Sequence, residues 1–363
     1  MSQIYGVTVG AGWDVGPGWG MGNTALPGFA TPALMNGSTT AVYLNSMAVS
    51  AAGRFVAVGG SNDSNNYPMF ATSTTGTTWT SPTRMDNVTT NAAMAAVAAN
   101  TAGLFVAVGN RGATNQPLCT TSTNGSTWTT PSLMQGISGD TFNGVACSSS
   151  GLFVAVGSGT GFQPLYSTST DGINWTTGNM PGSTQSIFQR VAVNTAGLFV
   201  SVGYDTTTAP VYATSTNGST WTTPARMNGS SAAARMYGIA VNTLGLFVAV
   251  GFNSSFQTVY ATSTDGSTWT TPALMNGSTA LAILGNIACD STGRFVAVGR
   301  DYTTNAPMYA TSTDGSTWTT PVLMNGSTAY AAMRAVAVNS SNQFVAVGTN
   351  SSTQAVYAVA TTF

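Results

Sequence analysis

The segment FVAVG at residues 295–299, followed by STDGSTW at residues 312–318, decides the fold because both segments recur along the chain. FVAVG occurs six times and FVSVG once. The copies begin at Phe55, Phe105, Phe153, Phe199, Phe247, Phe295 and Phe344. The intervals between them are 50, 48, 46, 48, 48 and 49 residues. A period of this length with four strand-like segments is typical of a propeller blade. The repeats therefore predict an all-β, seven-bladed β-propeller with four antiparallel strands per blade.

One copy shows the four expected strands, which read LGNIACD from residue 284, RFVAVGR from 294, PMYATST from 307 and STWTTPVLM from 316. The first two segments are apolar on both faces, which indicates sheets packed between two neighbours rather than a sheet with one wet face. Cys147 and Cys289 occupy positions that hold Val or Ala in the other copies. We interpret them as small buried apolar residues. Three cysteines in a chain of 363 residues do not imply a disulfide framework.

A Trp-containing segment lies between the third and fourth expected strands, and we call it the Trp box. It reads STTGTTW, STNGSTW, STDGINW, STNGSTW, STDGSTW and STDGSTW, ending at Trp79, Trp128, Trp175, Trp221, Trp269 and Trp318. Asp-Gly and Asn-Gly favour tight hairpin turns, and the Ser, Thr and Asp side chains can accept hydrogen bonds from nearby backbone amides. The box therefore predicts a structural turn followed by a packed Trp.

These boxes resemble the Asp-box (BNR-type) repeats of sialidase-like propellers, S-x-D-x-G-x-x-W, with one residue fewer between Asp and Gly. Together with FVAVG they are similar to propeller repeats of bacterial and phage surface and virion proteins, and the resemblance covers nearly the whole chain. It implies a box with a folding role, on the face away from the ligand.

The two ends of the repeat array predict how the ring closes. Only six Trp boxes accompany the seven FVAVG segments, and the chain finishes with AVYAVATTF, a third strand with no fourth after it. FATPALMNG at residues 29–37 matches WTTPALMNG at residues 269–277, with Phe29 in the Trp position. The N-terminal segment is therefore expected to supply the outermost strand of the last blade, which removes two open sheet edges.

Residues 1–24 precede the repeats, whereas residues 25–363 form the predicted propeller. The first segment is rich in glycine and contains Trp13 and Trp19. Two interpretations remain open for it: a tail packed on the propeller, or an arm that docks a partner.

Charged residues make up only 5% of the chain, which has nine Arg, ten Asp and no Lys, Glu or His. A net charge of −1 argues against a nucleic-acid surface, which needs clustered basic residues. The N-terminus has neither the basic nor the apolar region of a signal peptide, and no apolar run is long enough to insert into a membrane. We expect a virion or extracellular location, with lysis in place of a secretion signal.

The loops after the expected second and fourth strands differ from copy to copy, whereas those on the opposite face are nearly uniform. Divergence on one face suggests that this face binds ligands. Aromatic rings with short polar side chains suit carbohydrate. The predicted ligand-binding residues are Tyr67, Arg111, Phe162, Tyr204, Asp205, Phe252, Arg300, Asp301 and Tyr302 in the loops, and Arg190 and Arg334 near the axis. Phe256 lies in the same set of loops.

The sialidase resemblance raises the question of catalysis. Such enzymes use an Arg triad, a Tyr nucleophile with a Glu partner and an Asp acid/base; Arg190, Arg235 and Arg334 lie near the starts of inner strands, with Tyr237 close by. The chain has no Glu to activate a Tyr, and glycoside hydrolysis generally needs two carboxylates. Without His, zinc ligation by His and triad chemistry are excluded. We therefore expect no enzyme activity, no cofactor and no metal site.

Three functions remain as hypotheses. The first is a non-catalytic virion appendage or surface adhesin that binds a cell-surface glycan or other virion proteins. The second is a free-standing propeller lectin, and the third is a divergent or inactive sialidase-like glycosidase. The ligand and the oligomeric state stay open.

Overall fold

The computed structural model describes residues 28–38, 41–85, 91–112, 115–134, 139–182, 185–230, 233–277, 281–327 and 329–360. Residues 1–24, with Trp13 and Trp19, lie outside these ranges, and their interpretation stays a prediction. Within the described ranges there is no α-helix, and hence no helix long and apolar enough to cross a membrane.

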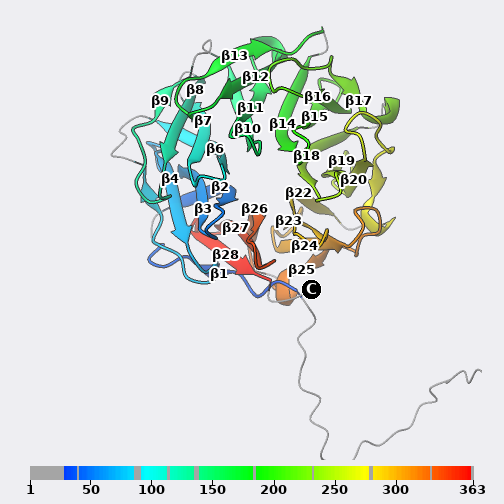
Figure 1. The fold of residues 1–363 in the computed structure, drawn as a ribbon. Coiled ribbons are helices and arrows are strands. Elements are labelled where there is room, and N and C mark those ends of the chain that lie inside the picture. The colour runs from blue at the N-terminus through cyan, green and yellow to red at the C-terminus, as the bar shows by residue number, and fades with distance from the viewer. Residues whose placement is uncertain are drawn as a thin grey trace, which may run out of the picture.

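The strands form seven antiparallel sheets of four strands each, arranged in a ring, which confirms the predicted seven-bladed propeller (Figure 1). Blade 1 comprises β2 (Val42–Val49), β3 (Phe55–Ser61), β4 (Pro68–Ser73) and β5 (Thr83–Arg84). Blade 2 comprises β6 (Ala92–Ala99), β7 (Phe105–Arg111), β8 (Gln116–Ser122) and β9 (Ser132–Leu133). Blade 3 comprises β10 (Thr141–Cys147), β11 (Phe153–Ser158), β12 (Pro164–Ser169) and β13 (Thr176–Asn179).

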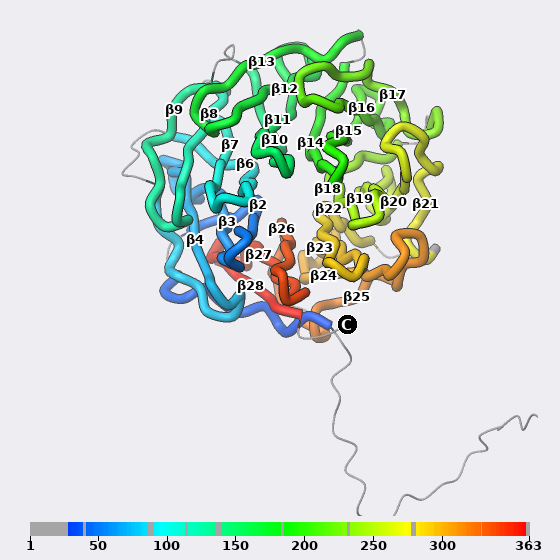
Figure 2. The backbone as a smooth tube through the Cα atoms, viewed as in Figure 1, coloured from blue at the N-terminus to red at the C-terminus, as the bar shows by residue number. Residues whose placement is uncertain are grey.

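Blade 4 comprises β14 (Ser186–Val193), β15 (Phe199–Asp205), β16 (Pro210–Ser215) and β17 (Ala225–Arg226). Blade 5 comprises β18 (Ala234–Val241), β19 (Phe247–Asn253), β20 (Thr258–Ser263) and β21 (Ala273–Leu274). Blade 6 comprises β22 (Ala282–Cys289), β23 (Phe295–Asp301), β24 (Pro307–Ser312) and β25 (Val322–Leu323). Blade 7 comprises β26 (Ala331–Val338), β27 (Phe344–Asn350), β28 (Ala355–Val359) and β1 (Ala33–Leu34). The first strand of each blade lies nearest the axis, as Figure 2 shows.

The hydrophobic core lies between the blades, and each FVAVG segment faces two neighbours. In blade 1, Val56 and Val58 pack against Phe105 and Ala107 of blade 2. Phe55 and Ala57, on the other face of the same strand, join a cluster with residues of blade 7. This arrangement explains why the strand is apolar on both faces, and it confirms the packing expected from the sequence.

The Trp box forms a turn that packs against the preceding blade. In blade 6, Ser312 Oγ accepts a hydrogen bond from Gly315 N (2.8 Å), and Trp318 Nε1 donates to Gly315 O (3.0 Å). Gly315 has a φ of +76°, and a Cβ there would meet Val248 of blade 5 at 2.8 Å. The turn thus needs glycine both for its backbone conformation and for its close approach to the preceding blade.

The N-terminal segment closes the ring as predicted, and β1 lies beside β28 in Figure 1. Ala33 pairs with Tyr357 and Leu34 with Val356. Phe29 takes the place of the box Trp: it is 2% exposed, and its ring lies edge-on to Tyr309 of blade 6 with centroids 5.3 Å apart.

A hydrogen bond along the outer rim repeats between neighbouring blades and also spans the closure. Asn228 Nδ2 donates to Thr271 Oγ1 (2.6 Å) and Asn276 Nδ2 donates to Thr320 Oγ1 (2.8 Å). In the last of these contacts Asn325 Nδ2 donates to Thr31 Oγ1 (2.9 Å). The N-terminal segment therefore makes the contacts that a fourth strand makes in the other blades.

The outermost strands are shorter than the sequence suggests. In blade 6 the Trp of STWTTPVLM forms an isolated bridge with Ser312, and the ladder resumes only at Val322–Leu323. Pro321 lies between these two parts, and proline cannot donate to a ladder. Blade 3 has Gly178 and one residue fewer at this point, and its outer strand β13 runs over four residues, Thr176–Asn179.

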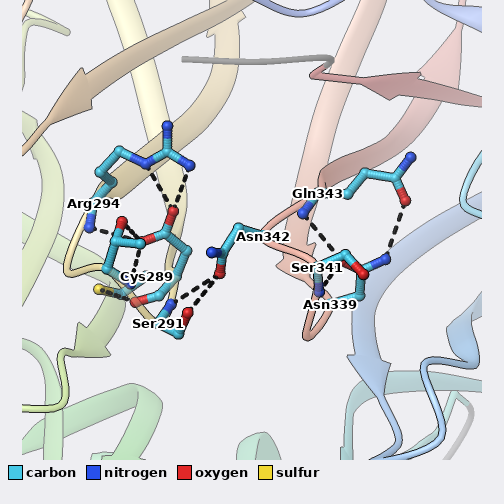
Figure 3. A network of polar contacts seen from close by, with 9 residues as sticks. Cys289, Ser291, Arg294, Asn339, Ser341, Asn342 and Gln343 are labelled. Carbon is cyan, nitrogen blue, oxygen red and sulfur yellow. Dashed lines mark hydrogen bonds and ion pairs between the residues drawn. The ribbon is translucent and has the colours of Figure 1, made fainter.

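The uniform turns on the box face also connect blades. Asn342 occupies the place where most copies have glycine, and it has a φ of +59°. Figure 3 shows its side chain beside Ser291 of blade 6, where Asn342 Oδ1 accepts from Ser291 Oγ (2.8 Å) and from Ser291 N (3.2 Å). In the turn of blade 6 that contains Ser291, Arg294 Nη2 lies 2.7 Å from Asp290 Oδ2.

Candidate functional site

Every innermost strand carries a β-bulge at the same point of the repeat. In each blade the register between the first and second strands shifts by one residue, ten positions before the Phe of FVAVG. The extra residues, which we call the bulge ring, are Asn45, Ala95, Asn143, Gln189, Tyr237, Gly285 and Arg334. Bulges re-aim a side chain without ending the ladder.

The glycine of FVAVG makes room for this bulge. Gly299, in blade 6, pairs with Leu284, directly beside bulge residue Gly285. A Cβ on Gly299 would collide with the carbonyl oxygen of Ile283, and the equivalent glycine of every other blade meets the same obstacle. The recurrence of this glycine therefore follows from the bulge, and the bulge is a feature of all seven blades.

All seven residues of the bulge ring line one cavity of about 430 Å³ on the propeller axis. This volume is within the range of small-molecule sites, roughly 300–1,000 Å³. The remaining lining residues come from the first and second strands of blades 4 to 7, and they are Arg190, Phe252, Ile283, Asn286, Arg300, Ala332 and Met333. The lining contains three arginines and no carboxylate.

Two asparagines of the bulge ring are held by the next blade. Asn45 Nδ2 donates to Met94 O (3.0 Å), and Asn143 Nδ2 donates to Phe188 O (2.9 Å). In blade 6, Asn286 Oδ1 accepts from Val336 N of blade 7 (3.1 Å). These bonds fix the side chains at the seams between blades.

Arg190 also belongs to a seam. Its Nη1 donates to Gln189 O (2.9 Å) and to Asn143 O of blade 3. Burial lowers the pKa of its guanidinium from the ordinary value, but an arginine remains charged in proteins. Arg190 therefore binds backbone carbonyls while lining the cavity.

Arg300 and Arg334 differ from Arg190. Neither forms a hydrogen bond or ion pair with another residue of the described ranges, where the salt bridges join Arg226 to Asp205 and Arg294 to Asp290. Burial, and then the positive charge of Arg300, lower the pKa of Arg334. The two guanidinium groups thus share one cavity without an anionic partner.

A row of aromatic side chains passes beside this cavity on the face of the variable loops, and two of its members, Tyr237 and Phe252, line the cavity. We call it the aromatic row, and it consists of Tyr204, Tyr237, Phe252, Phe256 and Tyr302. The successive ring centroids are 5.8, 5.0, 6.1 and 3.8 Å apart. The last three pairs are stacked, with interplanar angles of 6°, 26° and 10°. The row crosses blades 4, 5 and 6.

A smaller cavity of about 220 Å³ lies beside the row, between blades 4 and 5. Its lining consists of Thr208, Ala233, Arg235, Phe252, Asn253, Ser254 and Phe256, so Phe252 borders both cavities. The guanidinium carbon of Arg235 lies 5.2 Å from the centroid of Tyr204. The row therefore is a continuous apolar element between two hollows that contain polar groups.

The variable loops share one backbone feature although their sequences and lengths differ. Among its described residues, each loop between the second and third strands contains one non-glycine residue with positive φ, and these residues are Asn66, Asn115, Phe162, Thr208, Phe256, Asn305 and Thr353. The end of each loop is therefore alike, whereas the side chains and the loop lengths differ. Phe162 and Phe256 hold a bulky ring in a conformation that favours glycine and asparagine.

Six of the predicted site residues lie together. Arg190, Arg300, Arg334 and Phe252 line the axial cavity, and Tyr204 and Tyr302 belong to the aromatic row. The others are separate. Tyr67 of blade 1 lies under the guanidinium of Arg84, 3.4 Å from the ring centroid. Arg111 ends β7 in blade 2, and Phe162, 47% exposed, lies in the short 3₁₀ turn η1 (Thr160–Phe162) of blade 3.

The two predicted aspartates accept hydrogen bonds from backbone amides of their own loops. Asp205 is 4% exposed, and Asp205 Oδ1 accepts from Thr207 N (2.9 Å) and Ala209 N (3.0 Å). Asp301 Oδ1 likewise accepts from Thr303 N (2.9 Å) and Thr304 N (2.7 Å). These hydrogen bonds lower the pKa of both carboxyl groups below the ordinary value, against the raising effect of burial.

The bulge amides were not selected from the sequence, and Tyr237 and Phe256 were noted there without being predicted as ligand-binding residues. A signal for the bulge ring is present. Ten residues before each Phe the copies read Asn, Ala, Asn, Gln, Tyr, Gly and Arg, whereas the position before it is always Leu, Met or Phe. A position that differs in nearly every copy, next to one that is always large and apolar, indicates a side chain free of the core.

The thiols are outside this site. Burial raises the pKa of Cys147 to about 11, and burial together with the charge of Asp290 raises that of Cys289 to about 12. Among the described residues no group of three or more His, Cys, Asp or Glu side chains could hold a metal ion.

No protein-family model matches the chain, and no curated protein matches it in sequence. Solved structures with the same fold include the BP39L lectin from Burkholderia pseudomallei, 12% identical, with a TM-score of 0.67 over 90% of this chain and 97% of that one. YCF48 bound to D1 peptide is 13% identical, with a TM-score of 0.61 over 93% and 99%. The K499G mutant of the NanB sialidase from Streptococcus pneumoniae is 10% identical, with a TM-score of 0.52 over 92% of this chain and 70% of that one. At these identities the likeness concerns the fold alone.

Proposed function

We propose that this chain is a non-catalytic recognition propeller that binds glycans through the face of its variable loops. The observation that carries the proposal is the aromatic row, whose stacked rings lie beside a cavity rich in amides and arginines. Sugar rings stack on aromatic faces through their apolar sides, while amide and guanidinium groups take up hydroxyls. A lectin is among the solved structures with this fold, which is consistent with saccharide binding on such a framework.

We also propose that the site does not catalyse glycoside hydrolysis. Tyr237 lines the axial cavity, but no carboxylate shares that lining, and the chain contains no Glu. A Tyr without a neighbouring base is a weak nucleophile. A fluorogenic sialoside assay tests this point, and turnover that is lost in Tyr237→Phe would establish the glycosidase alternative instead.

We propose a virion appendage or a surface adhesin as the setting, with a cell-surface glycan and other virion proteins as partners. The support comes from the Lys-free composition and from the resemblance of the repeats to phage and bacterial surface proteins. Mass spectrometry of purified virions would detect the chain if it is an appendage. A protein that binds glycans but is absent from particles would be a free-standing lectin.

The binding experiment uses a glycan array probed with the intact chain, followed by calorimetry with the strongest ligand. We expect Phe256→Ala and Tyr302→Ala each to weaken binding about tenfold, because each removes one ring of the row. Leu244→Ala is the matched control, since Leu244 is 91% exposed in a turn on the opposite face. An array without any bound glycan, or equal affinity in all three variants, would contradict the proposal.

A further inference from the structure

We propose that β13, the outer strand of blade 3, is a dimerisation edge that pairs antiparallel with β13 of a second copy of this chain. In the described ranges β13 is the last strand of its sheet, and it lies on the outside of the ring (Figure 2). The inference concerns the rim of the propeller rather than its variable loops, so it is independent of the proposed glycan binding.

The outer segments of the other six blades carry a proline, and blade 3 is the exception. Its segment reads TTGNM at residues 176–180, whereas the others read ATPALM, TSPTRM, TTPSLM, TTPARM, TTPALM and TTPVLM. Proline on an edge strand removes a hydrogen-bond donor and places a ring where another strand would pair. It is one of the ways in which proteins prevent association through sheet edges. Blade 3 lacks this protection.

The outer strand of blade 3 is also more regular than the others. It pairs with β12 over four residues, Thr176 to Asn179, whereas the outer strands of the other blades pair over two. The amide of Met180 donates to Pro164 O (2.9 Å), so the ladder continues to the end of the segment. Because the peptide groups of a strand alternate between its two sides, the amide of Asn179 points away from β12. This edge therefore has the geometry that a further strand needs.

The turn before β13 departs from the repeat as well. Ile173 follows the glycine of the Trp box, at a position that holds Thr or Ser in the other boxes, namely Thr77, Ser126, Ser219, Ser267 and Ser316. Its side chain is 54% exposed, and covering such a side chain with a partner is favourable. Blade 3 thus combines a proline-free edge and an exposed apolar side chain in one hairpin.

A second copy of the chain is the partner that fits this edge. An edge strand is matched by another extended strand, and identical edges pair about a two-fold axis. Because the outer segments of the other blades contain proline, β13 is the edge that a second copy offers in return. Charge does not oppose the contact, since residues 172–182 contain no charged side chain and the net charge of the chain is −1.

Sedimentation equilibrium of the full chain tests the dimer over about a hundredfold range of concentration, because dimer formation follows mass action. We expect a reversible equilibrium between monomer and dimer. The decisive variant replaces TTGNM at residues 176–180 by TTPALM, which blade 5 has at residues 270–275. Its dimer dissociation constant should be at least about tenfold higher, because the proline prevents hydrogen bonds across the edge.

Two point variants accompany this replacement. Ile173→Ser introduces the residue found in four of the other boxes and should weaken the dimer by at least about threefold. Leu244→Ala is the matched control, because Leu244 is an exposed apolar residue in a turn of blade 5. It should dimerise as the parent chain does.

Hydrogen exchange in the unaltered chain locates the contact. The amide of Asn179 should exchange at least about tenfold more slowly when the protein concentration is raised into the dimer range. Leu274 has the equivalent register in blade 5, where it pairs with Val259 as Asn179 pairs with Leu165. Exchange of the Leu274 amide should not depend on concentration.

A chain that stays monomeric throughout the concentration range would overturn the proposal. A dimer that persists unchanged in the TTPALM variant, or that leaves exchange of the Asn179 amide unaltered, would also overturn it, since such a dimer uses another surface. Because the exchange measurement needs no substitution, it decides the question even if the replaced segment disturbs the fold.

Discussion

The ring of Phe256 in blade 5 stacks on that of Tyr302 in blade 6, with centroids 3.8 Å apart and planes 10° from parallel. Phe256 makes this contact from a backbone with a φ of +56°. In the loops of blades 1, 2 and 6 the equivalent positive-φ residue is Asn66, Asn115 or Asn305, for which this conformation is easier. The contact therefore combines local backbone strain with face-to-face packing of two rings.

Phe162 and Phe256 allow the strain and the stacking to be separated. Both have positive φ, but Phe162 belongs to no aromatic pair among the described residues. We expect Phe162→Asn to stabilise the fold by about 1 kcal/mol through relief of strain. Phe256→Asn should gain less, because it also loses stacking worth about 0.5–1.5 kcal/mol. Urea unfolding measures both, and an equal gain in the two variants would show that the stack contributes nothing.

We expect the glycine of FVAVG to be essential for the stability of the fold, whereas the bulge residue tolerates substitution. Gly299→Ala would drive a Cβ into the Ile283 carbonyl, and we expect a loss of at least about 3 kcal/mol in unfolding free energy. Gly285→Ala is the control in the same bulge: its Cβ would meet Tyr237 at an ordinary 3.5 Å, and Ala95 already occupies this position in blade 2. Its expected effect is within about 0.5 kcal/mol. A well-folded Gly299→Ala variant would refute this account of the repeat.

Closure of the ring depends on Phe29, which is buried against Tyr309. Phe29→Ala should cost about 3–5 kcal/mol, the usual range for a buried aromatic ring. Phe29→Trp restores the residue of the six boxes and should be tolerated, since Trp79 meets Tyr357 in the equivalent seam. Thermal unfolding with size-exclusion chromatography checks both variants. A Phe29→Ala protein as stable as the parent would mean that the N-terminal strand does not support the ring.

Acid should weaken the Trp boxes. Hydrogen bonds from Thr268 N and Ser267 N hold the pKa of Asp265 at about 2, and the amides of Thr317 and Ser316 do the same for Asp314. The unfolded chain binds these protons at about pH 3.9. Their contribution is therefore present above about pH 4 and is lost as the pH falls through 2. Because the carboxylates are exposed, solvent screening keeps this contribution small.

Unfolding midpoints in urea at pH 6, 4 and 2 measure this loss. The matched variant is Asp265→Asn/Asp314→Asn, because asparagine fills the same position at Asn124 and Asn217. It should show a shallower decline below pH 4. An identical pH profile would contradict a role for the two carboxylates.

Blade number, ring closure and the Trp box could be predicted because each depends on local sequence that repeats. FVAVG marks every second strand, and the match of residues 29–37 to residues 269–277 identifies the missing outer strand. The predicted length of the outer strand was wrong, because the effect of Pro321 on the ladder outweighed the continuity of the pattern.

The site was harder to predict because it depends on register and on ring geometry. The bulge requires one extra residue in the pairing of two strands, which no single strand reveals. Tyr237 and Tyr302 are far apart in the chain, and only the placing of neighbouring blades joins them through Phe252 and Phe256. Nor can composition show whether a loop aspartate faces a ligand or, like Asp205, its own backbone.

The residue type at the bulge ring differs among the blades, whereas the strand pairing around it stays the same. Its seven residues line the axial cavity from positions where Asn, Ala, Gln, Tyr, Gly and Arg are all accommodated by the same bulge. A single-codon change at any of them alters the chemistry of the cavity, and at Asn45 and Asn143 it also removes a hydrogen bond to the next blade. Related chains could thus differ in the lining of the cavity while their repeats stay almost identical. Substitution of the seven bulge-ring residues would redesign the cavity in the same way.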